Sequence, residues 1–112
     1  MNTSLVFQKC SDFYKSLYAD LGRIAKRDRY TCGQQCEKLT IEALSLSAKA
    51  SYLPKNEKRL AVRELSFTID LLKVFLRLGN ELRIIDYKHY LARESQLLEI
   101  GRMTGGWLKS CM

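Results

Sequence analysis

The segment from about residue 56 to residue 82 has the pattern of a long helix that is apolar on two flanks. One row recurs at helical spacing and consists of Ala61, Leu65, Thr68, Leu72, Phe75, Gly79 and Leu82. The other row contains Leu60, Phe67, Leu71, Val74 and Leu78. A helix on the surface of a globular protein needs only one apolar stripe. Because a bundle of four such helices has no deep centre, we expect the second row to be buried by self-association.

Two further helices are predicted before this segment. The first covers about residues 11 to 28, with Ser11 as its cap, or begins earlier at Ser4. The second begins at Thr31, whose hydroxyl and the side chain of Gln34 form a capping box. Its apolar residues alternate spacings of four and three, as in a bundle seam: Cys32, Cys36, Leu39, Ala43, Leu46, Ala50 and Leu53. Pro54 ends this helix, since the residue before a proline is pushed out of the helical region.

A last helix is predicted after Asp86, which is a good cap, and runs toward Lys109. The chain has 112 residues and a single proline, and it lacks Gly-rich or Ser-rich linkers. We therefore predict one domain over residues 1–112, an all-α, up-and-down four-helix bundle that assembles as a homo-oligomer.

The closing segment holds paired glycines, Gly105 and Gly106, directly before the only tryptophan, Trp107. Each glycine costs a helix interior roughly 1 kcal/mol relative to alanine, so the pair needs a packing reason. Gly101 and Gly105 are four residues apart and lie on one face of a helix. We predict that they let a neighbouring helix approach closely, with Trp107 as an apolar anchor beside them.

The chain is basic, with 19 Lys and Arg against 12 Asp and Glu and a formal net charge of +7. A charge of this sign suggests an acidic partner such as a phosphate polymer. Between the two apolar rows of the long helix runs a polar stripe: Arg59, Arg63, Ser66, Asp70, Lys73, Arg77 and Glu81. It is either a solvated face, with Asp70 pairing to Lys73 or Arg77, or a track for phosphates. Arg102 and Lys109 lie a heptad apart on the polar side of the last helix.

The sequence contains no motif for a nucleophile, a phosphate-binding loop or paired catalytic carboxylates, and its one histidine is His89. We therefore predict neither an enzyme nor a cofactor. Cys32 and Cys36 are interpreted as buried thiols rather than half of a metal site. We find no membrane span and no secretion signal in the sequence, so we predict a cytoplasmic protein. In the cytoplasm Cys10 and Cys111 are expected to stay reduced. The tyrosines recur periodically, which favours core or cap packing over base stacking.

Three stretches together resemble one known family. They are "RDRYTCGQ" at 27–34, "IDLLKVFLRL" at 69–78 and "EIGRMTGGWLKS" at 99–110, and the likeness extends over residues 13–110. The family is that of the accessory variability determinant proteins of diversity-generating retroelements. Its pattern has leucine in place of Cys32 and an apolar residue in place of Thr104.

The resemblance implies a four-helix bundle that forms a pentameric, tapered barrel with a basic surface. Such proteins bind the reverse transcriptase of the element and RNA or DNA, and the polymerase carries the chemistry. The family's basic positions correspond to Arg29, Lys73, Arg77, Arg102 and Lys109 here. Its packing positions correspond to Gly101, Gly105, Gly106 and Trp107.

These observations lead to a hypothesis of a non-enzymatic accessory subunit that supports mutagenic cDNA synthesis and retrohoming. The nucleic-acid-binding residues would be Arg29, Arg59, Arg63, Lys73, Arg77, Arg102 and Lys109. The packing residues would be Phe67, Leu71, Gly101, Gly105, Gly106 and Trp107. The alternative is a structural or protein-interaction bundle, like those encoded in ribosomal-RNA intervening sequences, whose basic residues only solvate the surface.

Overall fold

The computed structural model describes residues 4–111 and is helical almost throughout. Its four long helices are α1 (Leu5–Leu21), α3 (Gln34–Ala50), α4 (Lys55–Glu81) and α5 (Tyr87–Ser110). A short helix, α2 (Lys26–Asp28), and a π-helical turn, η1 (Arg29–Gly33), lead directly into α3. The predicted all-α four-helix fold is confirmed over these residues.

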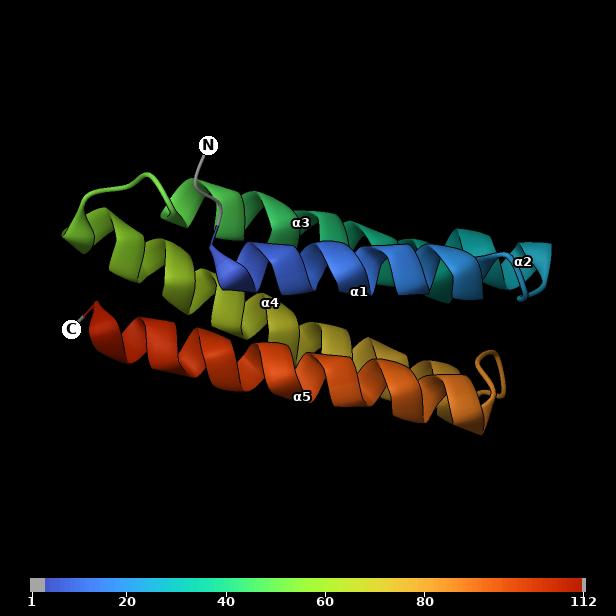
Figure 1. Ribbon diagram of the computed structural model, residues 1–112. Helices are drawn as coiled ribbons and strands as arrows, with labels where there is room; N and C mark the ends of the chain where they lie inside the picture. The colour runs from blue at the N-terminus through green and yellow to red at the C-terminus, as the bar shows by residue number, and fades with distance from the viewer. Residues whose placement is uncertain (1–3, 112) are drawn as a thin grey trace.

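The four long helices run up and down along one axis of an elongated molecule that measures 43 × 21 × 18 Å (Figure 1). Helix α3 packs against α4, α4 against α5, and α1 against both α3 and α5, so the helices form a closed square. The turn between α4 and α5 and the segment α2–η1 lie at one end, and the loop between α3 and α4 lies at the other (Figure 1). None of the helices within residues 4–111 has the length and apolar character needed to cross a bilayer.

The first predicted helix differs from the structure at both ends. It begins at Leu5, because the side chain of Ser4 accepts a hydrogen bond of 3.1 Å from the backbone N–H of Phe7 and caps it. It ends at Leu21 rather than at residue 28. The earlier of the two predicted starts is therefore confirmed, and the start at Ser11 is wrong.

The predicted capping box at Thr31 is also wrong. The chain is already helical from Lys26, so Thr31 lies inside a helical segment and cannot act as its cap. Its hydroxyl instead donates back to the carbonyl of Arg27 at 3.3 Å. The backbone N–H of Gln34 donates to the carbonyl of Thr31, which leaves no free donor there for a capping side chain.

The later boundaries are close to the predicted ones. Helix α3 ends at Ala50, and Pro54 is the residue that precedes the first turn of α4. The predicted cap at Asp86 is confirmed, since its carboxylate accepts a 2.8 Å hydrogen bond from the backbone N–H of His89. This bond, followed by the interaction with the His89 side chain, lowers the pKa of the Asp86 carboxyl.

The predicted seam on α3 is confirmed as part of the core. Its members Cys36, Ala43, Leu46 and Ala50 are buried. They meet the first apolar row of α4, in which Ala61, Leu65, Thr68, Leu72 and Gly79 are buried.

Thr104, where the family pattern has an apolar residue, is also fully buried, and its hydroxyl donates to the carbonyl of Ile100 at 2.7 Å. That departure therefore leaves no unpaired donor in the core.

The turn between α4 and α5 holds Arg83 in the left-handed backbone region, with φ of 61°. The backbone N–H of Arg83 donates to the carbonyl of Asn80 at 3.0 Å, and that of Ile84 donates to Gly79 at 2.8 Å. This pair of bonds is a Schellman motif, and glycine is the usual residue at the position that Arg83 occupies.

We expect Arg83→Gly to raise the free energy of unfolding by between about 0.5 and 1 kcal/mol. The change relieves about 1–2 kcal/mol of left-handed strain, part of which is offset by the greater freedom of glycine in the unfolded chain. Urea unfolding followed by circular dichroism measures the difference. Lys38→Gly, at an exposed position inside α3, is the control and is expected to lose about 1 kcal/mol. A less stable Arg83→Gly variant would contradict the prediction.

Candidate nucleic-acid interface

Four of the predicted nucleic-acid-binding residues lie on α4. Arg59, Arg63 and Arg77 are exposed, and Lys73 is half-buried. They recur at helical spacing, and Lys73 faces α5, because its amino group lies 3.0 Å from the position of a Cβ on Gly101. Helix α4 therefore presents a row of four cations, which we call the α4 stripe, in which Ser66 and Asp70 separate Arg63 from Lys73.

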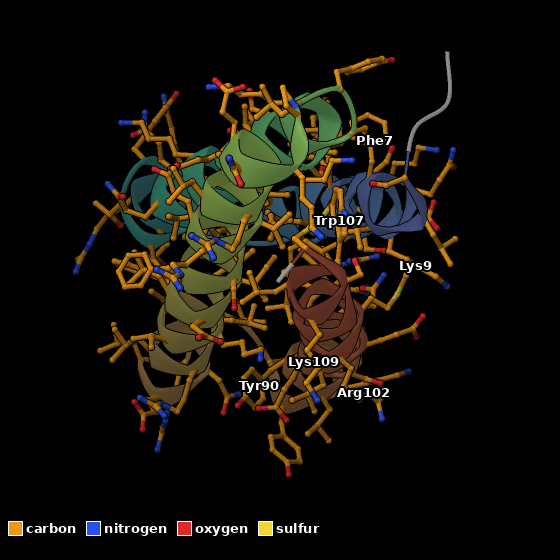
Figure 2. The ribbon with its side chains drawn as sticks, turned by 90° about the vertical axis from the view of Figure 1, so that its left-hand side faces the viewer. Phe7, Lys9, Tyr90, Arg102, Trp107 and Lys109 are labelled. Atoms are coloured by element: carbon orange, nitrogen blue, oxygen red, sulfur yellow. The ribbon has the colours of Figure 1, made fainter. Side chains whose placement is uncertain are left out.

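Two more of the predicted residues, Arg102 and Lys109, lie on α5. Both are exposed and point outward from that helix, whereas Trp107 points between the helices (Figure 2). Trp107 packs against the main core and also against the smaller cluster of Ala50, Ala61 and Val62. Trp107 thus packs within the chain, and its role as an anchor beside the glycines stays a prediction.

Most of these cations have no acidic partner. Over residues 4–111, only Lys73 among the seven predicted residues forms an ion pair, with the Asp70 carboxylate at 3.6 Å. This pair is partly exposed, and pairs of that kind contribute about 0–1 kcal/mol. The local pairing that the other interpretation predicts is made by Asp70 with Lys73 and not with Arg77. Arg59, Arg63, Arg77, Arg102 and Lys109 remain available to an anionic partner.

Arg29 lies on a different element from the other six residues. It is exposed in η1, at the end of the bundle opposite to the C-terminal end of α5 (Figure 1). Its neighbours in the sequence include Lys26 and Arg27, both exposed. The seven predicted residues thus lie on three elements, four on α4, two on α5 and Arg29 in η1.

The predicted close approach at the paired glycines is not made within the chain. A Cβ added to Gly105 or Gly106 would meet no atom within 4 Å, so no neighbouring helix of this protomer lies against them. Gly101 is approached only by the flexible side chain of Lys73. The packing explanation for Gly105 and Gly106 is therefore wrong inside one protomer, because α4 crosses α5 on another side.

The second apolar row of α4 is exposed in the protomer, as predicted. Phe67 is 65% exposed and Leu60 is 59% exposed, whereas Leu71 is half-buried. On α5, Leu91 and Leu98 are exposed as well. A row of large apolar side chains left exposed along a helix is unusual unless a partner covers it.

The tyrosines depart from the prediction. Tyr18, Tyr30, Tyr52 and Tyr87 are mostly exposed, so the preference for core or cap packing is wrong for these four. On α1 the reason is the register of the helix, because Val6, Cys10, Phe13 and Leu17 already fill its buried face. Tyr18 follows Leu17 by one residue, so its side chain lies on the neighbouring, exposed row of the helix. Sequence reasoning assigned it to the core because the helical period alone does not distinguish two adjacent rows.

Tyr18 and Tyr30 line a cleft of about 350 Å³ between α1 and the start of α3. Its other lining residues are Leu21, Gly22, Arg29, Gln34 and Glu37. A second cleft, of about 430 Å³, lies at the same end of the bundle, and Arg23, Arg83 and His89 are among its lining residues.

The thiols and the histidine are placed as packing and capping groups. Cys36 is buried and Cys32 is half-buried, and the four cysteines are free. Burial raises the pKa of the Cys10 thiol to about 11, so this thiol stays protonated near neutral pH. Within residues 4–111 no three potential ligands of the Cys, His, Asp or Glu type gather at one place. The ring of His89 lies 2.8 Å from the Asp86 carboxylate.

A family model described as bAvd-like matches residues 4–111. A search of curated proteins finds no match.

Proposed function

The chain belongs to the bAvd-like family, and on that premise we propose that it is an accessory, non-catalytic subunit of a diversity-generating retroelement. In this proposal it acts in the cytoplasm, binds the reverse transcriptase of the element and holds RNA or DNA during mutagenic copying. The polymerase carries the chemistry. The protein assembles with copies of itself, as the pentamer that the resemblance implies, through the exposed apolar row of α4.

The observation that carries the nucleic-acid part is the row of unpaired cations along α4 and α5. Five side chains, Arg59, Arg63, Arg77, Arg102 and Lys109, are exposed without an acidic partner among residues 4–111. Exposed cations on two neighbouring helices suit the phosphates of a strand, which are contacted without regard to base sequence. Binding of this kind depends on counterion release and therefore weakens as salt is added.

We expect the affinity for a single-stranded RNA to fall on the order of 100-fold when salt is raised from 50 to 200 mM. About five phosphate contacts give a slope of about −3.5 in a plot of log affinity against log salt for single strands. Fluorescence anisotropy with a labelled, unstructured oligonucleotide measures that slope. An affinity that hardly changes with salt would contradict the phosphate contacts.

A matched pair of charge-reversal variants locates the contacts. One variant replaces Lys73, Arg77 and Arg102 by Glu, and the other replaces Lys15, Lys38 and Lys49, which are exposed on α1 and α3. Each lowers the net charge by 6, from +7 to +1. We expect the first to lose binding and the second to keep most of it. Equal losses would mean that only the net charge matters and would favour the alternative, a structural bundle with a solvated basic surface.

A further inference from the structure

The cleft between α1 and the start of α3 has two exposed aromatic walls. The side chains of Tyr18 and Tyr30 are 68% and 66% exposed, and both line this cleft of about 350 Å³. Leu21 adds an apolar contact. An aromatic ring gains more from burial than most side chains, so two rings left open to solvent at one cleft indicate a surface that a flat ligand can cover.

Neighbouring side chains hold part of this cleft in place. The ring of Tyr18 packs against that of Tyr14, with ring centres 6.5 Å apart and an angle of 41° between the planes. The hydroxyl of Tyr14 donates a 3.0 Å hydrogen bond to Oε2 of Glu37 on α3. Tyr14 thus connects one aromatic wall of the cleft to a polar group on the other side. The walls need little reordering before a ligand binds.

The polar groups of the cleft match the parts of a nucleotide. The Gln34 amide donates and accepts, and the Glu37 carboxylate accepts, as the edge of a base requires. The guanidinium of Arg29, on the same cleft, suits a phosphate. The cleft volume lies within the range of small-ligand sites, which is about 300–1,000 Å³. Glu37 disfavours a ligand that is only an anion, because its negative charge would face that anion.

We infer that this cleft receives one unpaired nucleotide, with its base against Tyr18 and Tyr30 and its phosphate at Arg29. The inference deepens the proposed function and rests on it, since it assigns a place to a base of the strand that the α4 stripe holds by its phosphates. A base inside a duplex is already stacked and paired and cannot enter such a cleft. The site therefore gives the protein a preference for single strands, which a row of cations alone does not give.

The test compares a single strand with a duplex of the same sequence. We expect the Tyr18→Ala, Tyr30→Ala double variant to bind an unstructured single-stranded RNA about 10-fold more weakly than wild type, with its duplex affinity unchanged. The Tyr18→Phe, Tyr30→Phe variant keeps the rings and is expected to bind as wild type does. Tyr52→Ala is the matched control, because Tyr52 is 59% exposed in the loop at the other end of the bundle. Anisotropy titrations at one salt concentration give all the affinities.

The outcomes separate this inference from the proposed function. If the double Ala variant matches wild type on the single strand, or loses single-strand and duplex affinity equally, the nucleotide site is wrong while the phosphate contacts stand. If wild type binds neither nucleic acid, the proposed nucleic-acid function fails and the site fails with it. A free nucleoside monophosphate distinguishes the source of the ligand. If millimolar nucleoside monophosphate displaces the single-stranded RNA, the cleft is assigned to free nucleotides. If it does not displace the RNA, the cleft is assigned to a base within a strand.

Discussion

Replacing Asp20 by Asn is expected to lower the free energy of unfolding by about 3 kcal/mol or more. Asp20 is 5% exposed, and its carboxylate accepts hydrogen bonds from Arg93 Nε at 2.7 Å and from Arg23 Nη1 at 3.1 Å. It joins the end of α1 to α5. The side chain of Arg93 is only 15% exposed, so a neutral residue at position 20 would leave a nearly buried charge without its partner. Urea unfolding monitored by circular dichroism measures the loss.

Two further variants separate the ion pair from a general effect of altering α1. Asp12→Asn changes an exposed carboxylate on the same helix and is expected to stay within about 0.5 kcal/mol of wild type. Combining Asp20→Asn with Arg93→Met removes the unpaired charge and is expected to recover much of the stability, since apolar replacement of a buried pair is often neutral. An Asp20→Asn variant as stable as Asp12→Asn would show that the pair contributes little.

Features set by local spacing could be predicted from the sequence. The seam of α3 and the buried row of α4 follow from residues three and four apart, which share a face of any regular helix. The cap at Asp86 depends on residues within one turn. The α4 stripe could be predicted for the same reason. Its cations keep their spacing wherever the helix packs.

Features that depend on how helices meet could not be predicted. The ion pair of Asp20 and Arg93 joins residues 73 positions apart in the chain. The placement of Arg29 depends on α2 and η1 forming ahead of α3 at one end of the bundle. The surroundings of Gly105 depend on the side of α5 that α4 crosses. The cleft at Tyr18 and Tyr30 needs both the register of α1 and the early start of the helical segment before α3.

Replacing Leu60 and Phe67 together by Ser is expected to abolish self-association and leave a folded protomer of 13.0 kDa. Both side chains are more than half exposed on α4, so the change removes little from the core of the protomer. In an interface between copies, burying an apolar side chain of this size contributes about 1.5–3 kcal/mol, and central anchors contribute more. Native mass spectrometry measures the assembly, and circular dichroism measures the helix content.

A core variant provides the contrast for this assembly experiment. Leu65→Ala, at a position with no exposed area, is expected to cost about 2–5 kcal/mol of protomer stability, because it leaves a cavity where α4 meets α3. If the second apolar row of α4 is an interface, the two variants differ in what they lose. The Leu60→Ser, Phe67→Ser variant loses self-association and stays folded, whereas Leu65→Ala loses stability of the protomer fold. Two results would contradict this interface. The Ser variant could keep the mass of the wild-type assembly, or the wild type could itself be a monomer at high concentration. In either case copies of this chain do not cover the exposed row of α4, and another molecule or none covers it.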